Sequence, residues 1–226
     1  IKKGKLRGVE SDGMLCSGEE LGIDDDWYDG AEVYGIMMLG EDALPGMDVK
    51  EYLQLDDEVM DISVTANLPH CQYVYGVARE LAALLNRKLN APDFTYNAKE
   101  EANNNNITVE VKAPDLCPRY VAHYVKDVKI ERSPLWMRRR LKMCGINSIS
   151  TFVDITNYVL VEMGQPMHAF DMANVAGEKI VVRRAENGEK IVTLDEKEFT
   201  LNSENLVICD GEKAVALAGI MGGLNS

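Results

Sequence analysis

The stretch between residues 148 and 168 restricts the possible folds of this chain more than any other. Residues 148–164, SISTFVDITNYVLVEMG, are rich in β-branched side chains, but their length and the terminal Gly164 predict a helix ending at that glycine. Gln165 and Pro166 follow, and proline cannot continue a helix. After His168 the pattern changes to short alternating segments, which are typical of antiparallel strands. The sequence therefore predicts the α/β (α+β) class: a small helix-bearing N-terminal unit, then a mixed or antiparallel sheet domain with packed helices.

Several short segments are predicted strands because apolar and polar residues alternate in them. One follows the linker at 107–113, one or two more lie within 120–130, and an earlier one covers 58–64. The later ones are KIVVRRA (179–185), EKIVTL (189–194), EFTL (198–201), LVICD (206–210) and AVALAG (214–219), with a tight turn near Asp195-Glu196. Residues 219–223, GIMGG, predict a glycine-rich loop where a ligand can approach the backbone.

Residues 74–89 predict an amphipathic helix in a further part of the chain. Its buried stripe is expected to contain Val77, Leu81, Leu84 and Leu85, which recur at helical spacing.

A third helix is predicted near 134–144, with Ser133 as its N-cap and Pro134 as its first residue. Its buried face is expected to hold Met137, Leu141 and Cys144. The arginines 138–140 then form a solvated face, or alternatively contact RNA beside Trp136.

The charge and the rarer residue types exclude several functions. A net charge of −13 repels a polyanion, so an RNA partner requires other protein parts or a local basic patch. The five cysteines contain no CxxC pair and only three histidines are present, which predicts no zinc site and reduced cytosolic thiols. Residues 24–26 predict a solvated acidic turn without calcium-loop spacing. No apolar run approaches the length of a membrane span.

Composition along the chain predicts three parts and a linker. Residues 93–106 form the linker, since residues 90–106 are polar and contain four consecutive asparagines. The parts are 1–50, 51–92 and 107–226. The chain has no initiator Met and opens within a strand-like segment, so we expect a fragment of a longer protein.

A candidate ligand site lies on either side of Gly164. Thr156 and Asn157 precede His168 by about one helical segment, so a hydroxyl, an amide and an imidazole are close enough in sequence to converge on one small ligand. The alternative is structural: Thr156 and Asn157 bond a helix turn, and His168 is a core residue.

Several motifs occur in one order and resemble one family. They are CPRYVAHYV, SPLWMRRRL, VDITNYV, GQPMHAFD, IVVRRA and LAGIMGG. Together they resemble the B3/B4 editing domain of the bacterial phenylalanyl-tRNA synthetase beta subunit. The segment VESDGMLCSGEELG resembles the end of its OB-like tRNA-binding domain, and DDEVMDISV with the residues after it resembles part of its B1 domain.

The resemblance implies hydrolysis of tyrosine mistakenly esterified to phenylalanine tRNA, in a cytoplasmic alpha2beta2 enzyme with no membrane or DNA partner. It implies that His168 positions the ester or the attacking water, that Thr156 and Asn157 bind the aminoacyl group, and that Gly222 leaves room for the ring. It implies no metal or cofactor in this fragment, with ATP and Mg²⁺ held by other parts of the enzyme.

Two departures from the family pattern bear on activity. Asn147 stands where the family commonly has arginine, and the family's hydroxyl-reading glutamate lies beyond residue 226. The isolated fragment is therefore expected to be inactive. The alternative function is a non-catalytic scaffold that docks the alpha subunit and tRNA.

Overall fold

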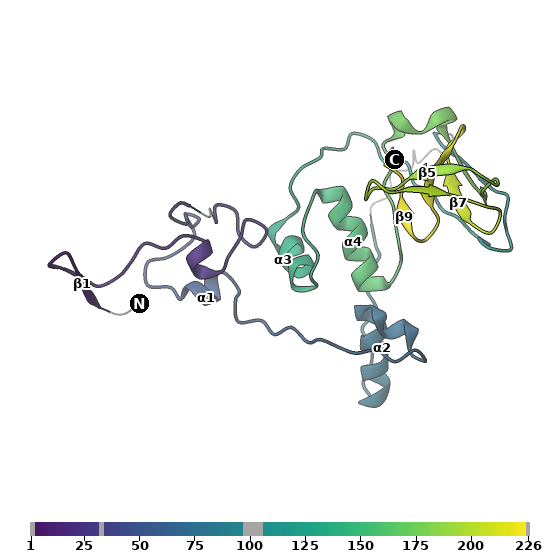
Figure 1. The fold of residues 1–226 in the computed structure, drawn as a ribbon. Coiled ribbons are helices and arrows are strands. Elements are labelled where there is room, and N and C mark those ends of the chain that lie inside the picture. The colour runs from purple at the N-terminus through teal and green to yellow at the C-terminus, as the bar shows by residue number, and fades with distance from the viewer. Residues whose placement is uncertain (1–2, 32–33, 97–105, 225–226) are drawn as a thin grey trace. The chain divides into compact units, whose positions relative to one another are not determined.

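The computed structural model describes residues 3–31, 34–96 and 106–224. Contacts divide the chain into two compact units: one comprises 1–77 with 130–164, and the other 78–129 with 165–226. Four α-helices and a mixed five-stranded sheet occur in the described residues, which confirms the predicted α/β class (Figure 1). The predicted linker, 93–106, falls mostly on 97–105, outside the described residues. None of the described helices is long and apolar enough to span a membrane.

The first unit begins with a hairpin of β1 (Gly4–Leu6) and β2 (Val9–Ser11). The short helices η1 (Glu19–Leu21) and α1 (Val49–Tyr52) follow. A loop-rich core forms around Leu53, which is fully buried. The other buried members of this core are Ile23, Tyr28, Ala31 and Met37.

The strand predicted at 58–64 is wrong. The segment has no regular secondary structure, and Val59, Met60 and Ile62 are all exposed. An alternating pattern predicts a strand only where a partner can pair with its backbone, and no ladder forms here among the described residues.

Helices α3 (Leu135–Met143) and α4 (Thr151–Met163) lie side by side in the first unit, as Figure 1 shows. Both were predicted, and α4 ends as expected at Gly164, whose φ of 73° suits glycine. The predicted start of α3 is wrong by one residue, because Pro134 occupies the N-cap position. Ser133 does not cap the helix; its hydroxyl instead donates to the Asp154 carboxylate, which is a strong acceptor.

The solvated arginine face predicted for α3 is also wrong. Arg138 is only 1% exposed, and its guanidinium donates to the Asp25 carbonyl and the Asp29 carboxylate, each at 2.8 Å. Arg139 is 7% exposed and donates to the Trp27 carbonyl at 3.1 Å. The acidic loop before Ala31 thus neutralises Arg138 through Asp29 and offers a backbone carbonyl to Arg139, both more than a hundred residues later in the chain.

That acidic loop is therefore more than the predicted solvated turn. Asp24 accepts a 2.8 Å ion pair from Lys142, and this hydrogen bond lowers the pKa of Asp24 while raising that of Lys142. Met137 and Leu141 are buried as predicted, but Cys144 is exposed at the end of the helix.

Helix α2 (Val74–Leu84) follows the short helix η2 (Pro69–Gln72) and confirms the predicted helix. Its expected buried stripe is wrong: Leu81, Leu84 and Leu85 are exposed, Leu84 by 80%. Periodicity predicted an apolar face correctly, but no described segment covers it. Gly76 is instead the buried residue of this helix. Only glycine fits there, because a Cβ would lie 1.5 Å from the His70 carbonyl oxygen.

The second unit is built on a sheet whose strand order is β3-β4-β7-β8-β9. The first pair is parallel and the others are antiparallel. A separate hairpin pairs β5 with β6, and short helices η3 (Met172–Asn174) and η4 (Ala176–Glu178) precede β4. The strands are β3 (Thr108–Val111), β4 (Lys179–Arg184), β5 (Lys190–Val192), β6 (Glu198–Thr200), β7 (Leu206–Cys209), β8 (Ala214–Leu217) and β9 (Met221–Gly222).

Two strand expectations differ from the observed sheet. Residues 120–130 form no strand, and Val121, Val125 and Ile130 are exposed. The expected loop at 219–223 is a turn at Gly219, with φ 71°, followed by strand β9. Glycines hide this strand from sequence reasoning because they weaken strand propensity.

Alternation along β4 and β7 places a core on each face of this sheet. On one face, Val181 and Val207 pack with Ile191 from the hairpin. On the other, Ile180 and Val182 pack with Val175 and with partly buried side chains that include Phe170. The segment after His168 is thereby fixed against the sheet.

Candidate functional site

His168 and Gly222 lie together in the second unit. A Cβ added at Gly222 would lie 2.4 Å from His168 Cε1 and 3.0 Å from Nε2. The imidazole therefore rests directly on the β9 backbone, a position that only glycine permits. The ring also packs edge-on against Phe170, with centroids 4.6 Å apart. Phe170 is itself held by the core, so His168 is oriented although much of its surface is exposed.

The environment of the imidazole changes its proton affinity. Partial burial of the ring lowers the pKa of His168 below its usual value of 6.5, because desolvation disfavours the charged form. The neutral form is therefore favoured near neutral pH, and a neutral imidazole carries one acceptor nitrogen. A neutral imidazole that is still accessible to water suits general-base chemistry or the positioning of a water molecule.

Thr156 and Asn157 belong to the first unit, on the second turn of α4. The Thr156 hydroxyl donates to the Val153 carbonyl at 2.7 Å, which leaves its oxygen lone pairs as acceptors. The Asn157 amide makes no hydrogen bond with a described residue, and the side chain is half-buried. The structure thus brings together His168 and Gly222, while the convergence of Thr156 and Asn157 with them stays a prediction.

Asp154 fixes the rotation of α4 and so the direction of its polar side chains. The carboxylate is fully buried and accepts hydrogen bonds from the Ser133 and Ser148 hydroxyls and from the Ile149 amide at 2.9 Å. Such a network satisfies the buried charge. Sequence reasoning missed this residue, although an acid in the first turn of a predicted helix was a usable signal.

Sequence reasoning also missed two residues that shape the surroundings of His168. Phe170 lies two positions later, so in an extended segment the two rings share a side, and this spacing was a usable signal. Leu194 has its Cδ1 3.0 Å from the position of a Gly222 Cβ, and its amide donates to the Gly222 carbonyl at 3.0 Å. No local pattern links Leu194 to His168.

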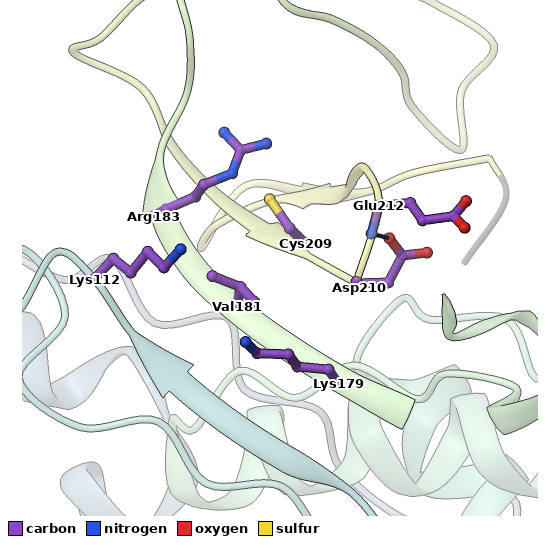
Figure 2. A pocket seen from close by; sticks show the side chains of 8 residues that line it. Lys112, Lys179, Val181, Arg183, Cys209, Asp210 and Glu212 are labelled. Carbon is purple, nitrogen blue, oxygen red and sulfur yellow. Dashed lines mark hydrogen bonds between the residues drawn. The ribbon is translucent and has the colours of Figure 1, made fainter. Parts of the chain in front are cut away.

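A polar cavity of about 170 Å³ lies elsewhere on the sheet and is a weaker candidate (Figure 2). Its cations already have partners: Lys179 pairs with Glu110 at 2.6 Å, and Arg183 binds Glu189 through two hydrogen bonds. The lining also includes Asp210 and Glu212, which disfavour an anion. Burial raises the pKa of the lining thiol, Cys209, to about 11, so it is a poor nucleophile.

A larger apolar hollow, of about 400 Å³, lies beside β9 and is lined in part by Phe199, Ile220 and Met221. Successive side chains of a strand point to opposite faces. Because Met221 lines the hollow and the next residue, Gly222, faces His168, the hollow and the imidazole lie on opposite faces of β9. The hollow is therefore separate from the His168 site.

Comparison with known proteins assigns this geometry to a family. The profile described as "B3/4 domain" matches residues 116–226, which include His168, Phe170 and Gly222. Over its whole length the chain is 48% identical to a protein of Clostridium tetani, 50% to one of Clostridium acetobutylicum and 47% to one of Bacillus cereus. Each relative is named phenylalanine–tRNA ligase beta subunit, and the chain covers 28% of each. The chain therefore belongs to the phenylalanine–tRNA ligase beta subunit family, and its residues 116–226 are a B3/4 domain.

Proposed function

We propose that this B3/4 domain, within a complete alpha2beta2 phenylalanine–tRNA ligase, hydrolyses tyrosine that has been esterified by mistake to phenylalanine tRNA. The observation that carries the proposal is the orientation of the His168 imidazole on Gly222, where burial also lowers the pKa of the ring. A pocket that accepts a phenyl ring cannot strongly reject the same ring with a hydroxyl added. A second site that hydrogen-bonds the hydroxyl can discriminate tyrosine from phenylalanine, because bound phenylalanine would leave the polar groups of the site unpaired.

The reaction requires water to attack the ester carbonyl, after which the bond to the ribose oxygen breaks and releases tyrosine and tRNA. His168 accepts a hydrogen bond from the attacking water, or the proton itself, through its unprotonated nitrogen. The proton then passes to the departing ribose oxygen. Water is proposed as the nucleophile, since a base that activates water hydrolyses an ester without a covalent intermediate.

Thr156 and Asn157 are proposed to hold the aminoacyl group. The lone pairs of Thr156 can accept from the α-amino group, and the unbonded amide of Asn157 offers both a donor and an acceptor. Gly222 was expected to leave room for the substrate ring. Its open space is taken by His168 and Leu194, so we assign to Gly222 the positioning of the imidazole.

Aminoacylation itself is assigned to other parts of the complete enzyme. ATP and Mg²⁺ are proposed to bind there, and no group of three or more His, Cys, Asp or Glu side chains in the described residues could hold a metal ion. The hydrolysis proposed above uses the side chains of this domain and water.

The proposal is tested with the complete enzyme and two substrates, tyrosyl-tRNA and phenylalanyl-tRNA, under single-turnover conditions. Rapid hydrolysis of the tyrosyl ester with at least tenfold slower hydrolysis of the phenylalanyl ester is expected. Equal rates for the two esters, or a tyrosyl rate no faster than in buffer, would contradict it.

A non-catalytic docking role is the second candidate, and the exposed apolar face of α2 favours it. Leu81, Leu84 and Leu85 project from a helix that no described segment covers. An exposed apolar face of this kind typically marks a protein interface. Leu84→Glu should then prevent assembly with the alpha subunit in size-exclusion chromatography, whereas Leu84→Met should assemble normally. Normal assembly of Leu84→Glu would remove this role.

A further inference from the structure

An aromatic cluster on the surface of α3 and α4 has the composition of a stacking site. Trp136 is 50% exposed, and the Tyr158 ring packs edge-on against it with centroids 5.4 Å apart. The Arg140 guanidinium lies 5.5 Å from the centre of the indole and donates to the Tyr158 hydroxyl at 2.8 Å. Arg140 and Tyr158 thus contact Trp136 as one hydrogen-bonded unit, while half of the Trp136 surface stays accessible.

Arg140 lacks the ion pair that neutralises Arg138 and Lys142 on the same helix. Arg138 binds Asp29, Arg139 is buried against backbone and amide oxygens, and Lys142 binds Asp24. Arg140 makes no ion pair with any carboxylate in the described part of the chain, and its side chain is exposed. Arg140 is therefore an unpaired cation beside an exposed indole, in a chain whose net charge is −13.

We propose that Trp136, Arg140 and Tyr158 stack an unpaired base of the tRNA. This inference rests on the proposed function, because it assigns a second contact to the tRNA whose ester His168 would hydrolyse. Every base has a π face that stacks on an indole, and arginine adds cation–π attraction and a charge for the adjacent phosphate.

A docked protein segment fits this surface less well than a base does. Protein interfaces centre on a desolvated apolar core. Here the indole is bordered by a guanidinium and a phenol hydroxyl, which already bond each other. These planar polar groups complement a flat heteroaromatic ring and the charge of its backbone.

The first test measures the Kd of the complete enzyme for uncharged phenylalanine tRNA. Trp136→Ala should raise the Kd about tenfold, whereas Trp136→Phe, which retains an aromatic face, should stay within about threefold. Arg140→Gln should raise the Kd and make its salt dependence less steep, since one cation is lost. Tyr34→Ala is the matched control, because Tyr34 is 98% exposed in the same unit and should bind tRNA normally.

The second test needs no substitution and so covers the case that Trp136→Ala does not fold. Ultraviolet cross-linking of the wild-type enzyme to tRNA should yield a nucleotide adduct on the tryptic peptide that contains Trp136. Cross-links confined to other peptides would overturn the proposal, as would a Kd of folded Trp136→Ala within twofold of wild type. Loss of alpha-subunit assembly with unchanged tRNA affinity would overturn it in favour of protein docking.

The two proposals fail in different ways. If the wild type hydrolyses tyrosyl-tRNA and folded Trp136→Ala binds tRNA normally, only the stacking site is wrong. If Trp136 cross-links to tRNA but the wild type does not hydrolyse the tyrosyl ester, only the editing function is wrong.

Discussion

The contact between Gly222 and His168 predicts the effect of adding a single methyl group. In Gly222→Ala the new Cβ would lie 2.4 Å from His168 Cε1, whereas ordinary contacts begin near 3.4 Å. The imidazole must therefore move by about 1 Å. Its ring is the far end of a side chain that is exposed on one side, so it moves rather than the strand. A misplacement of about 1 Å commonly costs about 10²-fold in rate, so we expect that loss in deacylation of tyrosyl-tRNA.

The stability of Gly222→Ala should change little. Gly222 is not among the glycines with positive φ, so alanine fits its backbone, and the free energy of unfolding should change by less than about 1 kcal/mol. Single-turnover deacylation and a thermal melting curve on the same preparation measure both effects. Gly13→Ala is the control, because its Cβ would meet nothing within 4 Å. A wild-type rate in Gly222→Ala, or a rate loss matched by a large loss of stability, would refute the positioning role.

Three further predictions follow from charges on the structure. Because burial lowers the pKa of His168, the acid limb of deacylation should lie below the usual histidine value of 6.5. The native state should also lose stability there relative to His168→Ala, since the unfolded chain binds the proton more readily. An acid limb well above pH 6.5 would contradict this. Arg138→Ala should lower the free energy of unfolding by about 2–4 kcal/mol in denaturant titration. Arg132 binds the same Asp29 with a partly exposed side chain, so Arg132→Ala should cost only about 0–1 kcal/mol. Equal losses for the two variants would be inconsistent with burial as the cause. The isolated chain, with net charge −13, should bind tRNA more weakly than micromolar at physiological salt in a filter-binding assay, and a tighter complex would show that the charge argument is wrong.

Features determined by neighbouring residues were predictable from the sequence. Helix α4 and its end at Gly164 follow from length, periodicity and a glycine at positive φ. The strands β4, β7 and β8 follow from local alternation. The loop predicted where β9 forms and the strands predicted at 58–64 and 120–130 were wrong. Strand formation depends on a partner strand, which local alternation does not reveal.

Features determined by distant residues were not predictable. Arg138 is buried because Asp29, 109 residues earlier, neutralises it. An arginine on a solvated helix face and an arginine in a buried ion pair can have the same neighbours in sequence, so the local pattern does not distinguish them. At the candidate site, residue types identified His168 and Gly222, but their direct contact and the role of Leu194 depend on the arrangement of β9 and the residues after β5. The exposed leucines of α2 show the reverse case, in which an apolar stripe is real but uncovered in the described chain.

The central claim is that His168 acts on the ester of tyrosyl-tRNA, and substituting it in the complete enzyme tests this most directly. The measurement pairs single-turnover deacylation by His168→Ala with its melting curve and its rate of phenylalanine charging. The account predicts deacylation slowed about 10²-fold or somewhat more, with charging and melting temperature almost unchanged. Unchanged deacylation in a mutant of unchanged stability would remove His168 from the site. Parallel loss of stability and of both activities would make it a core residue.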